Sequence, residues 1–205
     1  MSKTSMLDDP QTVLEWYDFI CPFCYVGQQR NTILVQNGFQ VIELPFQAHP
    51  DIPPEGILAG PRTGPMYAML ESEAREAGLQ LKWPQHLPNT RRALATAEWV
   101  RRHQPQLFPQ LYKDFFNAHF VLGEDLGNSA VIDRYASELG INLTALHAAL
   151  ADCSAAEAVS EAEMLGLKYG VQGTPAWLLN GQLITGLRPA AEFERLADDS
   201  KQLSR

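Results

Sequence analysis

The sequence predicts an α/β fold that is interrupted by an inserted α-helical domain, and three observations carry this prediction. The chain opens with a strand–helix–strand pattern, continues with helical patterns for roughly 100 residues, and closes with a helix–strand–strand–helix pattern. We therefore divide the 205 residues into a first part of the core (1–48), an α-helical insertion (49–153) and a second part of the core (154–205). The two sheet portions are expected to join around the insertion.

The first part has the pattern of a βαβ unit. Residues 13–20 are almost all apolar, as expected for a strand that is covered on both faces. A helix is predicted from Pro22 to Gly38, where glycine gives a C-terminal stop signal. Residues 39–47 alternate, so that three apolar side chains share one face of a second strand: Ile42, Leu44 and Phe46. Such a short unit implies parallel strands.

The middle part begins with a loop rich in proline and glycine and then turns helical. Four helices are predicted, at 66–77, 89–100, 108–116 and 129–139. The aromatic side chains on the third helix are interpreted as core, because such stripes are far more often core than a cofactor site.

The last part begins with a capping-box pattern from Ser154 to Glu157, which opens a helix that runs to Tyr169 and is stopped by Gly170. Strand patterns at 176–179 and 182–185 flank an Asn-Gly pair, the strongest short hairpin signal, and a final helix follows Pro189.

Composition limits the classes of function. Hydrophobic residues make up 45% and charged residues 20% of the chain, which is ordinary for a soluble globular protein. A net charge of −8 argues against nucleic acid or membrane partners, and no apolar run is long enough to span a bilayer. The arginine pairs at 91–92 and 101–102 are expected on solvated helix faces. Residues 1–11 show no apolar signal-peptide core, so a cytoplasmic location is expected.

The most informative motif is Cys21-Pro22-Phe23-Cys24, where the first strand passes into the first helix. Cys21 is expected at the helix N-terminus, where unpaired N–H groups and the positive end of the dipole favour a thiolate. Cys24 lies three residues on, and therefore on the same helical face. One thiolate can attack a disulfide and the other can resolve the mixed disulfide, so the motif predicts a redox-active centre of the CXXC kind.

Thr174 and Pro175 immediately precede the predicted strand at 176–179. Proline is tolerated at the start of a strand for structural reasons, and only about 5–6% of X-Pro bonds in folded proteins are cis. A cis bond would turn the backbone groups of Thr174 outward, where they could bind an extended peptide beside the dithiol. The residues alone leave both interpretations open.

The ordered combination of these motifs resembles the thioredoxin fold, and the helical insertion makes the chain similar to the DsbA-like family. Residues 18–27 are similar to the start of FrnE-type proteins, and residues 89–93 and 169–175 also match that pattern. The resemblance covers nearly the whole chain.

The resemblance implies a dithiol–disulfide oxidoreductase in which Cys21 attacks and Cys24 resolves. Thr174 and Pro175 correspond to the loop that docks the substrate, with Pro22 and Phe23 contacting it beside the dithiol. Two positions depart from the family: Leu94 stands where many relatives carry histidine, and Phe23 provides no imidazole. We therefore expect Cys21 to be acidified mainly by the helix end, and the couple to be less oxidising than a Pro-His one.

Two further residues and a metal were considered. Asp18 could relay a proton to or from Cys24, although a structural role, ending the strand and binding a nearby turn, is favoured. Cys153 is expected to be a partly buried small residue, not a third redox thiol. A structural zinc site needs four ligands and one cysteine pair supplies two, so no metal is expected.

The leading function is exchange with protein or small-thiol disulfides, with no cofactor beyond the redox-active disulfide and glutathione as a candidate co-substrate. A glutathione-dependent isomerase or transferase is the first alternative, because 2-hydroxychromene-2-carboxylate isomerases and kappa-class glutathione transferases resemble the chain in architecture. Those enzymes typically place serine where Cys21 stands and lack the second cysteine. The second alternative is a non-catalytic peptide-binding module.

Overall fold

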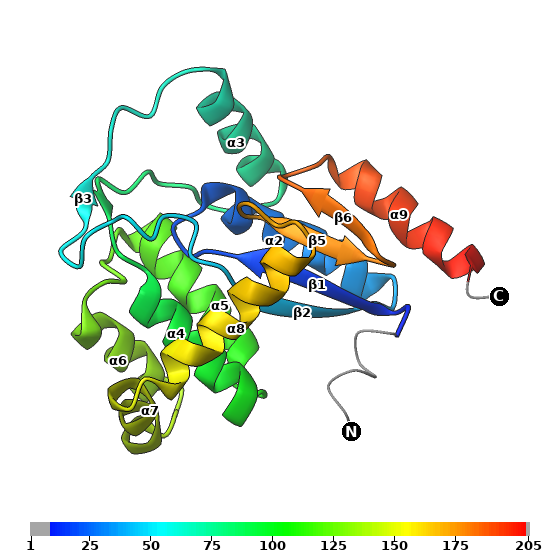
Figure 1. Cartoon of the computed structure of the whole chain (residues 1–205). Helices are drawn as coiled ribbons and strands as arrows, with labels where there is room; N and C mark the ends of the chain where they lie inside the picture. The colour runs from blue at the N-terminus through cyan, green and yellow to red at the C-terminus, as the bar shows by residue number, and fades with distance from the viewer. Residues whose placement is uncertain (1–8, 204–205) are drawn as a thin grey trace.

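A four-stranded sheet lies at the centre of the protein, and the computed structural model describes residues 9–203 (Figure 1). Its strands are β1 (Thr12–Tyr17), β2 (Gln40–Pro45), β5 (Ala176–Leu179) and β6 (Gln182–Thr185). Their order is β2-β1-β5-β6, with β1 parallel to β2 and the other neighbours antiparallel. The first and last parts of the chain therefore complete one sheet, as the sequence predicts.

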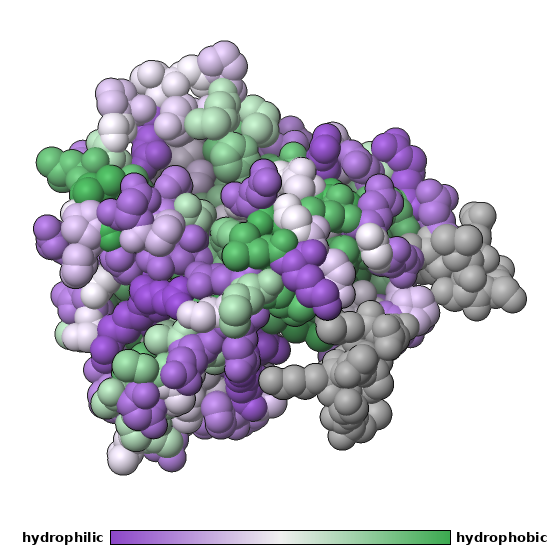
Figure 2. All heavy atoms as spheres, in the orientation of Figure 1, coloured by the Kyte–Doolittle hydropathy of each residue, from purple (hydrophilic) through white to green (hydrophobic). Residues whose placement is uncertain are grey.

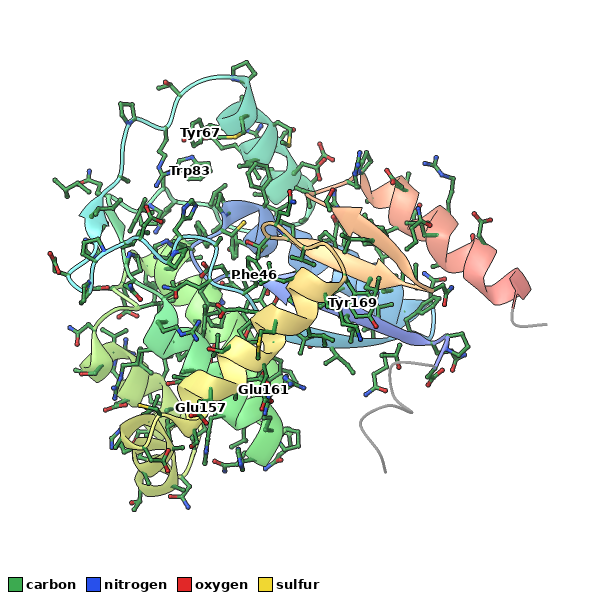
Figure 3. The ribbon with its side chains drawn as sticks, in the orientation of Figure 1. Phe46, Tyr67, Trp83, Glu157, Glu161 and Tyr169 are labelled. Carbon is green, nitrogen blue, oxygen red and sulfur yellow. The ribbon has the colours of Figure 1, made fainter. Side chains whose placement is uncertain are left out.

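Helices cover both faces of this sheet. The helices α2 (Pro22–Gln36) and α9 (Ala190–Leu203) lie on one face, where Leu34 and Phe193 pack against Trp177. Helix α8 (Ser154–Lys168) crosses the other face and packs on Trp16. Phe46 and Tyr169 lie at the border of that contact (Figure 3).

The insertion is built from α3 (Pro65–Glu76), α4 (Arg91–His103), α5 (Phe108–Asn117), the π-helix η1 (Ala118–Leu122), α6 (Ser129–Glu138) and α7 (Leu143–Ala151). Helices α3 to α6 lie where the sequence predicts them, whereas α7 and η1 are not predicted. Two-residue strands β3 (Ile57–Leu58) and β4 (His86–Leu87) also pair antiparallel. A green patch over β3 in Figure 2 marks the exposed Ile57 and Leu58.

The long loop before α3 is tied to the loop after it by aromatic contacts. The rings of Tyr67 and Trp83 meet edge to face at 5.1 Å between centroids (Figure 3). The guanidinium of Arg62 lies 5.6 Å from the Trp83 ring, a cation–π distance. Helix α3 and the two loops lie at the top of the molecule in Figure 1.

The core runs through the junction between the βαβ unit and the insertion. Tyr17 and Phe19, which end the first strand pattern, contact Tyr112, Phe115 and Phe116 of α5 at ring-centroid distances from 4.8 to 6.3 Å. The interpretation of the α5 stripe as core is thus correct. The division at residues 48 and 153 stays a prediction about chain segments, since one apolar cluster includes side chains from each segment.

Three details differ from the sequence analysis. Cys153, not Ser154, is the N-cap of α8, and it has a left-handed φ of 68° in a turn after α7. That turn leaves Cys153 exposed, so the expectation of partial burial was wrong. The arginine pairs are not simply solvated: Arg91 binds Glu163 at 2.7 Å, and Arg101 binds the fully buried Glu98 at 2.7 Å.

Among residues 9–203, no helix is both long enough and apolar enough to cross a membrane.

Candidate active site

Cys21 lies where the carboxyl end of β1 turns into α2, on the side of the sheet that faces the insertion (Figure 1). It is the N-cap of α2, and Pro22 follows at the first helical position. Its sulfur donates a hydrogen bond of 3.3 Å to the backbone carbonyl of Thr174, from the loop before β5. The Thr174–Pro175 peptide bond is cis, which answers the question that the residues alone left open.

Cys21 is held in an environment that favours its thiolate. Burial alone would raise the pKa of the Cys21 thiol, and the nearby Asp18 adds to that, yet hydrogen bonds outweigh both and lower this pKa from its ordinary value. The hydrogen bonds come from the thiol of Cys24, from the side chain of Thr174 and from the backbone N–H of Cys24. The helix end therefore contributes, but it is not the main cause that the sequence analysis expected.

Cys24 has the opposite character. Its side chain is fully buried. Burial, the hydrogen bond to Cys21 and the negative charges of Cys21 and Glu15 raise the pKa of the Cys24 thiol well above its ordinary value. The pair therefore consists of one partly exposed sulfur that ionises readily and one buried sulfur that retains its proton.

The remaining predicted site residues surround Cys21. Pro22 and Phe23 are partly exposed, and Phe23 packs on the edge of the aromatic core. Pro175 is buried under α2 at Gly27, where an added Cβ would lie 3.3 Å from the Trp177 ring and 3.9 Å from the proline ring. The glycine thus allows helix α2 to approach the proline loop closely. Leu94, which stands where many relatives carry histidine, is fully buried in the core.

One residue near the dithiol was missed by the sequence analysis. Glu15, in the middle of β1, is fully buried and receives hydrogen bonds from Asn31 at 2.5 Å and Tyr112 at 3.2 Å. Burial, helped by the charge of Glu43, raises the pKa of Glu15 to about 8. The signal was present in the sequence, since an acid inside a strand covered on both faces must be buried.

A chain of contacts links Glu15 to the proline loop. Trp177, which follows Pro175 by two residues, donates its indole N–H to Asn31 at 2.8 Å, and Asn31 in turn donates to Glu15. The strand after the loop, helix α2 and strand β1 are thereby fixed to one another.

Asp18 behaves as the structural interpretation expects. Its carboxylate accepts the backbone N–H of Ala48 at 2.8 Å and that of Ile20 at 3.4 Å, which fixes the turn between β1 and α2. Burial raises the pKa of Asp18. Within residues 9–203, no group of three or more His, Cys, Asp and Glu side chains is arranged to hold a metal ion.

Comparison with solved structures finds the same fold in proteins of low identity. A probable DsbA oxidoreductase from Streptomyces coelicolor superposes with a TM-score of 0.79 at 19% identity, over 93% of this chain and 90% of that one. A 2-hydroxychromene-2-carboxylate isomerase gives 0.73 at 19% identity, over 95% and 96%. The cytosolic disulfide reductase DsbM from Pseudomonas aeruginosa, solved with GSH, gives 0.61 at 16% identity, over 94% and 97%.

Among curated proteins, none matches the chain. The sequence model of the DSBA-like thioredoxin domain, however, matches residues 12–198, which include the dithiol, the insertion and the cis-proline loop. With that match and the observed fold, the chain belongs to the DSBA-like thioredoxin domain family.

Proposed function

We propose that the protein is a dithiol–disulfide oxidoreductase of the FrnE type, which works through Cys21 and Cys24. The observation that supports this most directly is the contrast between the two sulfurs. Cys21 is partly exposed, lies against the Thr174 carbonyl and has a lowered pKa, whereas Cys24 is fully buried and has a raised pKa. Attack and resolution need these two different thiols.

In the first step, the Cys21 thiolate attacks one sulfur of a substrate disulfide R–S–S–R′. The Cys21–S–S–R bond forms, the substrate S–S bond breaks, and R′S⁻ leaves with the electron pair. The Thr174 carbonyl lies 3.3 Å from the Cys21 sulfur, and the backbone of Thr174 is proposed to bind the substrate chain beside it, next to Pro175.

In the second step, Cys24 loses its proton and its sulfur attacks Cys21. The Cys21–Cys24 disulfide forms and RS⁻ leaves, so the substrate gains two electrons and the dithiol loses two. Glu15 is the buried carboxyl whose ionised form we propose as acceptor of this proton, and its pKa of about 8 means that this form is a minor fraction at neutral pH and grows as pH rises. The reverse sequence oxidises a substrate dithiol.

The disulfide substrates are proposed to include protein disulfides and mixed disulfides with glutathione. The structural relative DsbM is described as a cytosolic disulfide reductase and was solved with GSH, which supports glutathione as co-substrate and a cytoplasmic location as parts of the proposal. No cofactor beyond the dithiol is invoked.

A glutathione-dependent isomerase is the second candidate, because a 2-hydroxychromene-2-carboxylate isomerase has the same fold at a TM-score of 0.73. The two cysteines favour redox exchange over isomerisation, since a resolving thiol has no use in an isomerase that binds glutathione without oxidising it.

Substitution of each cysteine tests the proposal. We expect Cys21→Ser to abolish reduction of insulin disulfides, and Cys24→Ser to accumulate a stable mixed disulfide on Cys21 that is visible as a mass increase. Cys153→Ser is the matched control, because this third thiol is exposed and should leave the rate unchanged.

Full insulin reduction by the Cys21→Ser protein would refute the proposal. If the Cys21→Ser protein retained isomerase activity, the isomerase alternative would replace the proposal. If the wild type showed no redox activity and Cys21→Ser still bound peptides, the peptide-binding alternative would replace it.

A further inference from the structure

The arginine pair at 91–92 has no part in the dithiol mechanism, and it opens helix α4 beside a pocket of about 310 Å³. The pocket lies between α4, the start of α8 and the turn before α6. Helix α4 packs against both of the other helices, at the lower left of Figure 1. Small-molecule sites measure about 300–1,000 Å³, so this pocket has room for a small ligand.

The two arginines differ in their partners. One Nη atom of Arg91 binds the carboxylate of Glu163 at 2.7 Å. The other donates to the Ala156 carbonyl at 3.1 Å and to the Ser160 hydroxyl at 2.7 Å. Arg92 lines the same pocket, but its guanidinium has no hydrogen-bond or ion-pair partner within residues 9–203, and its Nε is buried. Because a guanidinium keeps its charge, the pocket contains a cation that lacks an anion.

Three helices begin around the pocket and add to its positive potential. Arg91 and Arg92 are the first two residues of α4, Ala156 is the third residue of α8, and Gly127 lies two residues before α6. Asn89 accepts the N–H of Arg91 at 3.0 Å. The other N–H groups of a first helical turn have no acceptor inside the helix, and the helix dipole is positive there. These helix starts therefore favour an anion in the same place as Arg92 does.

Two carboxylates contact residues of the pocket wall, and both are already bound. Glu163 accepts hydrogen bonds from Arg91 and, at 3.1 Å, from the backbone N–H of Gln47. Asp125 accepts the backbone N–H of Gly127 at 2.8 Å. Neither carboxylate is among the described residues that line the pocket, so neither compensates the charge of Arg92.

We propose that this pocket binds a phosphate group, either as free phosphate or as part of a small phosphate ester. A phosphate accepts hydrogen bonds on all sides, which suits donors that come from a guanidinium and from several helix starts. A planar carboxylate would satisfy the guanidinium alone. Pro54, Ala95 and Leu150 provide apolar wall that a small substituent on the phosphate can contact.

Titration of the reduced protein with inorganic phosphate, followed by NMR at an ionic strength held constant with chloride, tests the site. We expect saturable shifts of the Nε–H of Arg92 and of the backbone N–H of Ala156. Propyl phosphate distinguishes the two sources of the group: tighter binding than that of inorganic phosphate identifies an ester, and equal or weaker binding identifies free phosphate. Acetate should shift neither resonance.

Three variants assign the binding to the pocket. Arg92→Gln should weaken phosphate binding at least about tenfold, because it removes a hydrogen bond between two charged groups. Its rate of disulfide exchange should match the wild type, which shows that it is folded. Arg195→Gln is the matched control, since it removes the same charge from an exposed position on α9, across the sheet from α8, and should bind phosphate normally.

Ala156→Glu tests the pocket independently of Arg92. A carboxylate in the first turn of a helix suits the helix dipole, so α8 should fold as in the wild type. The new negative charge lies in the pocket wall and should abolish phosphate binding. This variant decides the question even if Arg92→Gln folds poorly.

Four results would each overturn the proposal: shifts that grow with phosphate concentration without saturating, equal binding of acetate, wild-type affinity in Arg92→Gln or Ala156→Glu, and lost binding in Arg195→Gln. All four leave the proposed function standing, because exchange through Cys21 and Cys24 does not depend on this pocket.

Discussion

The reactive sulfur is controlled by a few individual side chains. Cys21 meets the Thr174 carbonyl at 3.3 Å and is stabilised as a thiolate by Cys24, while Phe23 contributes no charge or hydrogen bond. The motif and the proline loop could be predicted because their residue types are specific. The burial of Glu15 could be predicted from the sequence, but its place at the site could not, because that depends on contacts with Asn31 and Tyr112, which lie elsewhere in the chain.

A change at Phe23 tests this view of the thiolate. Phe23→His adds an imidazole beside Cys21, so we expect a lower pKa for the Cys21 thiol and a more oxidising couple. The reduction potential should rise by at least about 30 mV, which is about a tenfold change in the equilibrium with glutathione. Titration of thiolate absorbance and a glutathione redox series would measure both quantities, with Phe23→Leu as control. An unchanged potential in Phe23→His would show that the imidazole is irrelevant here.

The helices and strands that position the site were predictable to different degrees. Long segments with an apolar period, such as α4 and α8, begin and end close to the predicted residues. The hairpin turn is also correct, with positive φ at both Asn180 and Gly181. Strands β3 and β4 are too short to show alternation. Helix α7 has nine residues with apolar side chains on most sides, so it shows no helical period either.

The contact of α8 with the sheet gives a prediction about stability. Trp16 donates its indole N–H to the Ala162 carbonyl of α8 at 3.0 Å, and a Cβ at Gly166 would lie only 2.8 Å from the same nitrogen. Gly166→Ala should therefore lower the free energy of unfolding by about 1–3 kcal/mol, despite the better helix propensity of alanine. Urea denaturation would measure it.

Gly60→Ala is the matched control for this substitution, because no atom lies within 4 Å of an added Cβ there. It should leave the free energy of unfolding within about 0.5 kcal/mol of the wild type. Equal stability of the Gly166→Ala and Gly60→Ala proteins would contradict the close packing of α8 on Trp16.

At the scale of the whole molecule, the sequence did not show which elements share the core. Segments separated by about 100 residues share one aromatic cluster, in which Phe19 meets Phe115 at 5.3 Å between ring centroids. Periodicity shows which face of each helix is apolar, but not which other element covers it. The insertion therefore supports the site, since Tyr112 of α5 donates to Glu15, whose charge acts on Cys24.

The buried carboxyl makes stability depend on pH. The folded protein raises the pKa of Glu15 from 4.5 to about 8, mainly because it is buried. Between these two pH values the unfolded chain has released this proton while the folded chain retains it, so the Glu15 contribution to stability falls as pH rises. The full difference corresponds to on the order of 5 kcal/mol.

Glu15→Gln has no proton to release at this position, so its stability should decline much less than that of the wild type between pH 4.5 and 8. Chemical denaturation of the reduced proteins across this range would show the difference, with Glu194→Gln, a change on the exposed face of α9, following the wild type. Parallel curves for Glu15→Gln and the wild type would mean that Glu15 titrates normally.

The most direct test of the central claim is the rate at which each cysteine of the reduced protein is alkylated as pH is varied, with the modified residue identified by mass spectrometry. Cys21 should react faster than free cysteine at neutral pH and show a lower midpoint, while Cys24 stays unmodified in the folded protein. If Cys21 reacts no faster than free cysteine, or if Cys24 is modified first, the assignment of attacking and resolving thiols is wrong.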